Sequence, residues 1–127
     1  MYQVSVRDHF DAAHYLRGYE GKCENLHGHR FEVVVTAEAL DLDETGLTYD
    51  FTKLKGHLRE VMGLLDHVCL NDIPLFDRLN PSSENIAAAV WGEMKRRLGR
   101  APVRLVSIQV YESPDAWVTY FPEDGSS

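Results

Sequence analysis

The sequence predicts an α+β fold in which two helices cover one face of a four-stranded antiparallel sheet, in the order ββααββ. Three observations lead to this class: two long alternating stretches near the start, two central stretches with helical apolar spacing, and two short alternating stretches near the end. Strands that flank a pair of helices, rather than alternating with them, are typical of this class. With 127 residues, we expect one domain, 1–127, with one core.

The first two strands are expected at Gln3–His14 and Gly28–Leu40. Most apolar residues of the first strand share the parity of His14, and the apolar row of the second shares the parity of His27 and His29. Successive residues of a strand point to opposite faces, so all three histidines are expected to point inward if neither strand has a bulge.

The first helix is expected to follow Asp50 or Thr52, because either side chain can cap a helix. Its apolar residues recur at helical spacing as far as Leu65. The segment 71–81 contains two prolines and is expected to be a loop.

The second helix is expected to start at Ser82 or Ser83, either of which can cap it, and to end at Gly99. Glu84 in its first turn suits the helix dipole. We therefore interpret the run Ser82–Asn85 mainly as a capping motif.

A hairpin is expected at the end of the chain, with strands at Arg104–Glu112 and Trp117–Phe121. Val106, Ile108 and Val110 share the parity of Glu112, so a carboxylate ends an apolar row. Glu112 either reaches solvent or presents two acceptor oxygens to a planar N–H/NH₂ edge, such as that of a 2-aminopyrimidinone.

Composition excludes several classes of protein. The net charge of −7 argues against nucleic acid as a partner, because a phosphate backbone needs a basic surface. No apolar run approaches the roughly 18 residues of a membrane span, and the first residues lack the apolar core of a secretory signal. Without such a signal, we expect a cytoplasmic protein. In a reducing compartment its two cysteines, Cys23 and Cys69, are not expected to form a disulfide, and a metal-linked or catalytic role for one of them is more plausible.

A candidate metal site combines His14 with the run Cys23-Glu24-Asn25-Leu26-His27-Gly28-His29. Imidazoles are good zinc ligands, and a catalytic zinc keeps three protein ligands and an open position. Cys23 is either a fourth ligand, which would close a structural site, or an unbound thiol activated beside the metal. The alternative is that the histidines are ordinary half-buried side chains.

Asp66 and His67 are adjacent at the expected end of the first helix. They are either a pair that tunes proton transfer, or a histidine at the negative end of the helix dipole beside a surface carboxylate. A structural zinc site has no use for this pair or for an inward Glu112, which favours an enzyme.

The expected sheet leaves two apolar edge strands. Exposed edges of this kind pair with other chains unless they are covered. We therefore expect a closed oligomer.

The sequence resembles the 6-pyruvoyltetrahydropterin synthase family, and within it the bacterial branch of 6-carboxytetrahydropterin synthases. The matching motifs occur in the family's order and are Phe10-Asp11-Ala12-Ala13-His14, Cys23-x3-His27-Gly28-His29, Asp50-Phe51, Leu65-Asp66-His67, Pro81-Ser82-Ser83-Glu84-Asn85 and Tyr111-Glu112. The resemblance implies the tunnelling fold, with trimers that form a barrel and stack as a homohexamer, a dimer of trimers.

The resemblance also implies roles for the candidate residues. His14, His27 and His29 would bind Zn²⁺, and Cys23 would be the general base rather than a ligand. Asp66 and His67 would complete the proton-transfer set. Glu112 would anchor the pterin, in an active site that lies between subunits.

The implied substrate is a pterin triphosphate, 7,8-dihydroneopterin triphosphate. The bacterial branch converts it to 6-carboxy-5,6,7,8-tetrahydropterin, acetaldehyde and triphosphate, on the way to queuosine. The three-residue spacer between Cys23 and His27 argues against the 6-pyruvoyltetrahydropterin product of the animal-type branch. Glu24 resembles the glutamate of a folate branch that yields 6-hydroxymethyl-7,8-dihydropterin, so a dual activity is an alternative, as are a plain solvated Glu24 and a non-catalytic pterin-binding zinc module.

Overall fold

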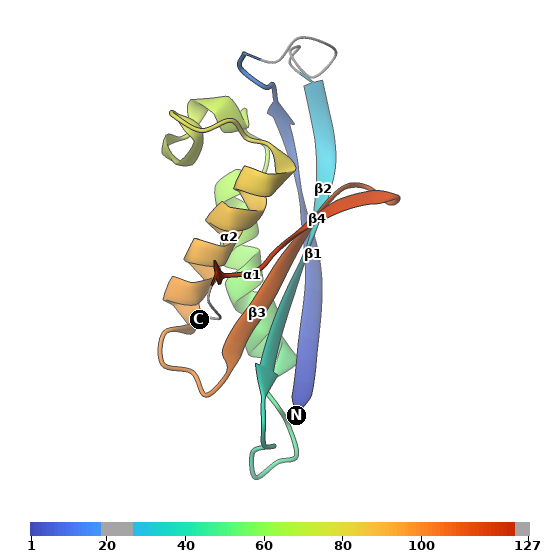
Figure 1. Ribbon diagram of the computed structural model, residues 1–127, viewed down its shortest axis with the longest axis vertical. Coiled ribbons are helices and arrows are strands. Elements are labelled where there is room, and N and C mark those ends of the chain that lie inside the picture. The colour runs from blue at the N-terminus through green and yellow to red at the C-terminus, as the bar shows by residue number, and fades with distance from the viewer. Residues whose placement is uncertain (19–26, 124–127) are drawn as a thin grey trace.

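The computed structural model describes residues 1–18 and 27–123, with the backbone alone at His27. An antiparallel sheet runs in the order β1-β2-β3-β4, and helices α1 and α2 lie together on one of its faces (Figure 1). The element order confirms the predicted ββααββ arrangement, and each strand end lies within one residue of its expected position. The strands are β1 (Tyr2–His14), β2 (His27–Ala39), β3 (Arg104–Ser113) and β4 (Ala116–Tyr120), and the helices are α1 (Phe51–Leu65) and α2 (Ser83–Leu98).

The core lies between the helices and one face of the sheet. Residues of β1 and β2 alternate in burial, and Phe10 stacks on Phe31 across the two strands with ring centroids 4.9 Å apart. The helices contribute apolar stripes to the same core, among them Leu58 and Val90. Burial of these apolar stripes is the main force that holds the two helices on the sheet.

Each helix is capped by one of the two residues that the sequence offers, Asp50 rather than Thr52 and Ser82 rather than Ser83. The Asp50 side chain accepts from the backbone N–H of Thr52 at the start of α1, and Ser82 accepts from that of Asn85 at the start of α2. Gly99 ends α2 at φ +53°, a value that favours glycine. In the part of the chain that the structure describes, no helix combines the length and apolarity needed to cross a membrane.

The expectation that Val106 faces the core is wrong. Thr36 pairs with Ser107 while Ala37 pairs with Leu105, so Val106 is the extra residue of a β-bulge. A bulge reverses the facing of the residues beyond it, and Leu105 is buried in place of Val106. Ile108 and Val110 keep their predicted inward positions.

The segment after α1 lies along the outer edge of β1. The backbone N–H of His67 donates to the carbonyl of Asp11, and the N–H of Ala13 donates to Val68. The expected loop 71–81 contains two single-turn 3₁₀ helices, η2 (Leu70–Asp72, which begins just before it) and η3 (Pro74–Phe76). This segment reaches the end of the sheet where β1 finishes and β2 starts (Figure 1).

Candidate functional site

His14 and His29 lie on the core face at the end of β1 and the beginning of β2. The backbone of His29 pairs with Ala12, and that of His14 pairs with His27. Both imidazoles contact the edge of the buried Phe31 ring, with centroids 5.2 Å away for His14 and 5.4 Å for His29. The apolar row of the sheet therefore ends in two imidazoles that pack against the ring of Phe31.

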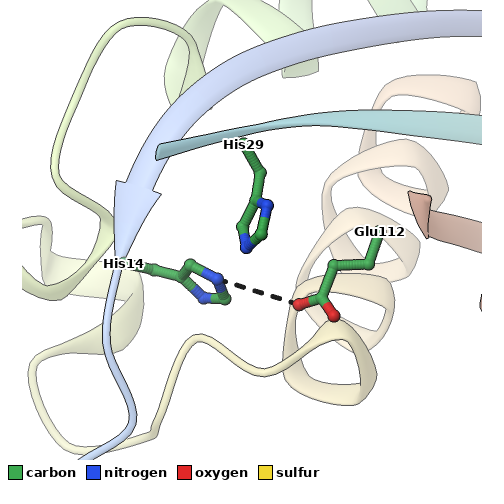
Figure 2. Close-up of side chains that lie close together, drawn as sticks. All are labelled: His14, His29 and Glu112. Carbon is green, nitrogen blue, oxygen red and sulfur yellow. Dashed lines mark ion pairs between the residues drawn. The ribbon is translucent and has the colours of Figure 1, made fainter. Parts of the chain in front are cut away.

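Glu112 completes a cluster with these two histidines, and all three side chains converge in Figure 2. One ligand atom from each lies within 4.8 Å of the other two, and His14 Nε2 is 3.7 Å from Glu112 Oε1. Zinc lies about 2.0–2.2 Å from nitrogen and oxygen ligands, so small side-chain movements would let these atoms share one ion. The three residues could thus hold a divalent metal, and we call His14, His29 and Glu112 the metal cluster.

The orientation of His14 is fixed from its far side. Its Nδ1 is 2.8 Å from the carbonyl oxygen of Pro81, just before α2. A carbonyl only accepts, so Nδ1 carries the proton and donates it, and Nε2 presents its lone pair toward the cluster. Metal-bound histidines are commonly held in this way by a partner of the second ring nitrogen.

Glu112 reaches the cluster from a second irregularity of β3. Tyr111 pairs with Trp117 and Ser113 with Ala116, so Glu112 lies at a register shift beside the hairpin turn. Its side chain is 43% exposed, whereas that of His14 is 3% exposed. The carboxylate therefore lies on the solvent side of the cluster, where a ligand that enters from solvent can contact it.

The remaining predicted ligands and the candidate base are only partly described. His27 begins β2 opposite His14, and its part in the metal site stays a prediction. Cys23 and Glu24 lie outside the described residues, so the question of ligand or base for Cys23 stays open in the structure.

Asp66 and His67 form a contact, as the sequence suggested. His67 Nδ1 is 2.9 Å from Asp66 Oδ2, and the other oxygen, Oδ1, accepts the backbone N–H of Asp11 at 2.8 Å. The Asp11 N–H, together with His67, holds the pKa of the Asp66 carboxyl below its usual range. Asp66 is the C-cap of α1, and its bond from the Asp11 N–H ties this end of the helix to β1.

His67 has a left-handed backbone, with φ +59°. This conformation costs a non-glycine residue roughly 1–2 kcal/mol, although histidine tolerates it better than most. It directs a 79% exposed ring outward, with Nδ1 toward Asp66. Nε2 is then on the side of the ring that faces away from the carboxylate, where a proton can be exchanged with a ligand.

A shallow depression includes one residue from each candidate region, His29 and His67. It has a volume of about 530 Å³, and its lining includes Asp11, Gly28, His29, Arg30 and His67. His29 belongs both to this depression and to the metal cluster. Neither Asp66 nor His67 belongs to the metal cluster itself among the described residues.

Sequence reasoning missed the Pro81 carbonyl and the Asp11 N–H as parts of the site. Both are backbone groups, and a backbone group acquires a role only through its position in the fold. The one available signal was the placement of Pro81 directly before the capping serines.

Comparisons with known proteins agree with this architecture. Residues 3–123 match the family model of 6-pyruvoyl tetrahydropterin synthase. A Synechocystis protein named 6-carboxy-5,6,7,8-tetrahydropterin synthase is 38% identical, covering 88% of this chain and 87% of that protein. The 6-pyruvoyl tetrahydrobiopterin synthase of Homo sapiens is 35% identical over 93% of this chain and 90% of its own.

A solved structure shows the same fold. The 6-pyruvoyl tetrahydropterin synthase of Caenorhabditis elegans superposes with a TM-score of 0.86 at 28% identity, covering 96% of both chains. The matched order of strands and helices confirms the predicted tunnelling fold. The chain belongs to the 6-pyruvoyl tetrahydropterin synthase family of enzymes.

Proposed function

We propose that the chain is a zinc-dependent lyase that converts 7,8-dihydroneopterin triphosphate to 6-carboxy-5,6,7,8-tetrahydropterin, acetaldehyde and triphosphate, a step toward queuosine. The observation that carries the proposal is the cluster of His14, His29 and Glu112 in a chain 38% identical to a protein named for that product. A relative from Bacillus subtilis with the same name is 32% identical over 98% of the chain.

The donor set fits zinc. His14 and His29 offer imidazole nitrogens on a buried face, and His27 at the start of β2 is the third ligand by its resemblance to the family motif. Three imidazoles leave a fourth position open, as a catalytic zinc requires. Zinc in such a site acidifies hydroxyl groups of a bound substrate and stabilises the negative charge that forms on them.

Glu112 is proposed to hold the pterin ring rather than to be a permanent zinc ligand. Its partly exposed carboxylate has two oxygens that can accept from an adjacent N–H and NH₂. This pairing would orient the side chain of the substrate toward the imidazoles of His14 and His29.

His67 and Cys23 are proposed to move protons. Asp66 orients His67 through Nδ1, so Nε2 is directed away from the carboxylate and can donate or accept a proton at the substrate. Cys23 would take a proton as thiolate at a different atom. Because His67 is outside the metal cluster of its own chain, we propose that it serves a site shared between subunits of a homohexamer, in the cytoplasm.

The experiment that tests the function is incubation of purified, zinc-loaded protein with 7,8-dihydroneopterin triphosphate, followed by identification of the products. Acetaldehyde together with a 6-carboxypterin is expected. A 6-pyruvoyl product, or no turnover by protein that binds zinc and substrate, would contradict the proposal. The second result would leave the non-catalytic pterin-binding zinc module.

A dual activity is the second candidate, because Glu24 follows Cys23 directly. In that case the same incubation also yields 6-hydroxymethyl-7,8-dihydropterin. Glu24→Gln would remove this product and leave the 6-carboxypterin, whereas Cys23→Ala would do the reverse.

Cys23→Ala also separates a catalytic thiol from a fourth zinc ligand. We expect the variant to keep about one zinc per chain and to lose formation of the carboxypterin. Loss of zinc together with a fall in thermal stability would instead indicate a closed structural site.

A further inference from the structure

Two asparagine side chains continue the hydrogen-bond ladder of β1 past its last residue. Asn71 accepts the backbone N–H of Tyr15 and donates to its carbonyl, both at 3.0 Å. Asn80 does the same for Arg17, at 2.8 and 3.0 Å. Each amide thus replaces a neighbouring strand, and the two residues they hold are spaced as alternate residues of a ladder are.

The side chain of Arg17 adds a second set of contacts to the same segment. Its guanidinium donates to the carbonyl oxygens of Asn71, Phe76 and Leu79 at 3.0–3.2 Å. These carbonyls belong to η2, to η3 and to the turn that follows. We call Arg17, Asn71 and Asn80 the clamp.

The clamp lies beside both partners of the hydrogen bond that orients His14. Asn71 holds Tyr15, the neighbour of His14, and Asn80, which holds Arg17, is itself the neighbour of Pro81. Asn80 is also tied to α2, because its carbonyl accepts from the side chain of Asn85 at 2.8 Å. The His14 Nδ1 donor and the Pro81 acceptor are therefore positioned by the same residues.

Burial distinguishes the clamp from an ordinary surface network. Asn71 is only 6% exposed, and its amide oxygen and nitrogen both have backbone partners. Burying an amide is costly unless it is fully hydrogen-bonded, and a satisfied buried network makes its surroundings rigid. A rigid support is what a metal site needs to keep its ligands in the binding geometry.

We propose that Arg17, Asn71 and Asn80 are positioning residues of the metal centre, which lock the tautomer and orientation of His14 through Pro81 and so set the affinity for a divalent cation. This inference rests on the proposed zinc site. It assigns a role to residues outside the cluster of His14, His29 and Glu112.

The test is a titration of metal-free protein with Co²⁺, followed by absorption spectroscopy, together with ¹⁵N NMR of the His14 ring to identify its tautomer. The variants are Asn80→Ala, Asn71→Ala and Arg17→Lys. Lysine keeps the charge but replaces the planar fork that reaches three carbonyls. Gln3→Ala is the matched control, because it removes an amide hydrogen bond, to Glu38, at the far end of β1.

We expect each clamp variant to bind Co²⁺ about 10-fold or more weakly and to show a mixed His14 tautomer, while Gln3→Ala behaves like the wild type. Full rescue by Arg17→Lys would mean that only charge matters and would overturn the role of the fork. If Asn71→Ala does not fold, the more peripheral Asn80→Ala and Arg17→Lys decide.

Lower thermal stability with unchanged Co²⁺ affinity and tautomer would overturn the inference and leave a purely structural clamp. Wild-type protein that binds no Co²⁺ would overturn the proposed zinc site itself. The two failures are therefore distinguishable.

Discussion

The metal cluster and the Asp66–His67 pair both present histidines, but the chain builds them in opposite ways. His14 and His29 are placed by strand register, over a buried aromatic ring. His67 is placed by a left-handed turn at the end of a helix and is largely exposed. A metal ligand needs a fixed ring and a fixed tautomer, whereas a proton-transfer group needs access to the ligand. The surroundings of the two sites match these different needs.

The largest effect is expected from His14→Ala, which removes a proposed zinc ligand and its bond to Pro81. Zinc affinity should fall by more than the roughly 10- to 100-fold that loss of an outer-shell partner costs, measured by chelator competition. His9→Ala is the matched control, because His9 lies on the same strand but is exposed. Equal zinc affinity in the two variants would show that the cluster does not bind the metal.

The second-largest effect is expected at the Asp66–His67 pair. His67→Gly should lower turnover by roughly 10²- to 10⁴-fold with zinc content unchanged, since the proposed proton-transfer group is lost. Glycine adopts φ +59° without strain, so the free energy of unfolding should stay within about 1 kcal/mol of the wild-type value. His57→Ala, on α1, is the control for loss of a histidine, and normal turnover by His67→Gly would contradict the catalytic role.

A smaller effect is expected from Glu112→Gln, which tests whether Glu112 binds the substrate or the metal. A neutral amide cannot accept from two adjacent donors, so KM should rise about 10-fold or more, as loss of a hydrogen bond to a charged group predicts. Zinc content should not change. Glu32→Gln is the control, because Glu32 lies on β2 with a half-buried side chain outside the metal cluster. Loss of zinc from Glu112→Gln would make Glu112 a ligand.

The smallest effect is a pH dependence of stability. The pKa of Asp66 is lowered in the folded protein, so its contribution is present above the unfolded value of about 3.9 and is lost as the pH falls through the folded pKa. Urea unfolding should show wild type and Asp66→Asn converging as the pH is lowered from about 7 to about 3. A constant difference over that range would show that the Asp11 and His67 contacts do not stabilise the carboxylate.

The alternating and helical patterns of apolar residues determined the element order and much of the fold. They predicted the order of elements, the strand ends to within one residue, two candidates for each helix cap, of which Asp50 and Ser82 are the caps, and the shared face of His14 and His29. These features depend on local periodicity and on side chains that act on their own backbone, so they can be read without knowing the partners of each segment.

Only the tertiary structure decided the rest. The bulge at Val106 depends on how β3 meets β2, and the approach of Glu112 to His14 depends on a second irregularity of β3. The carbonyl that fixes His14 comes from Pro81, far along the chain. Register shifts and backbone acceptors have no side-chain signature, because any residue provides the same backbone groups, and their role is set by packing alone.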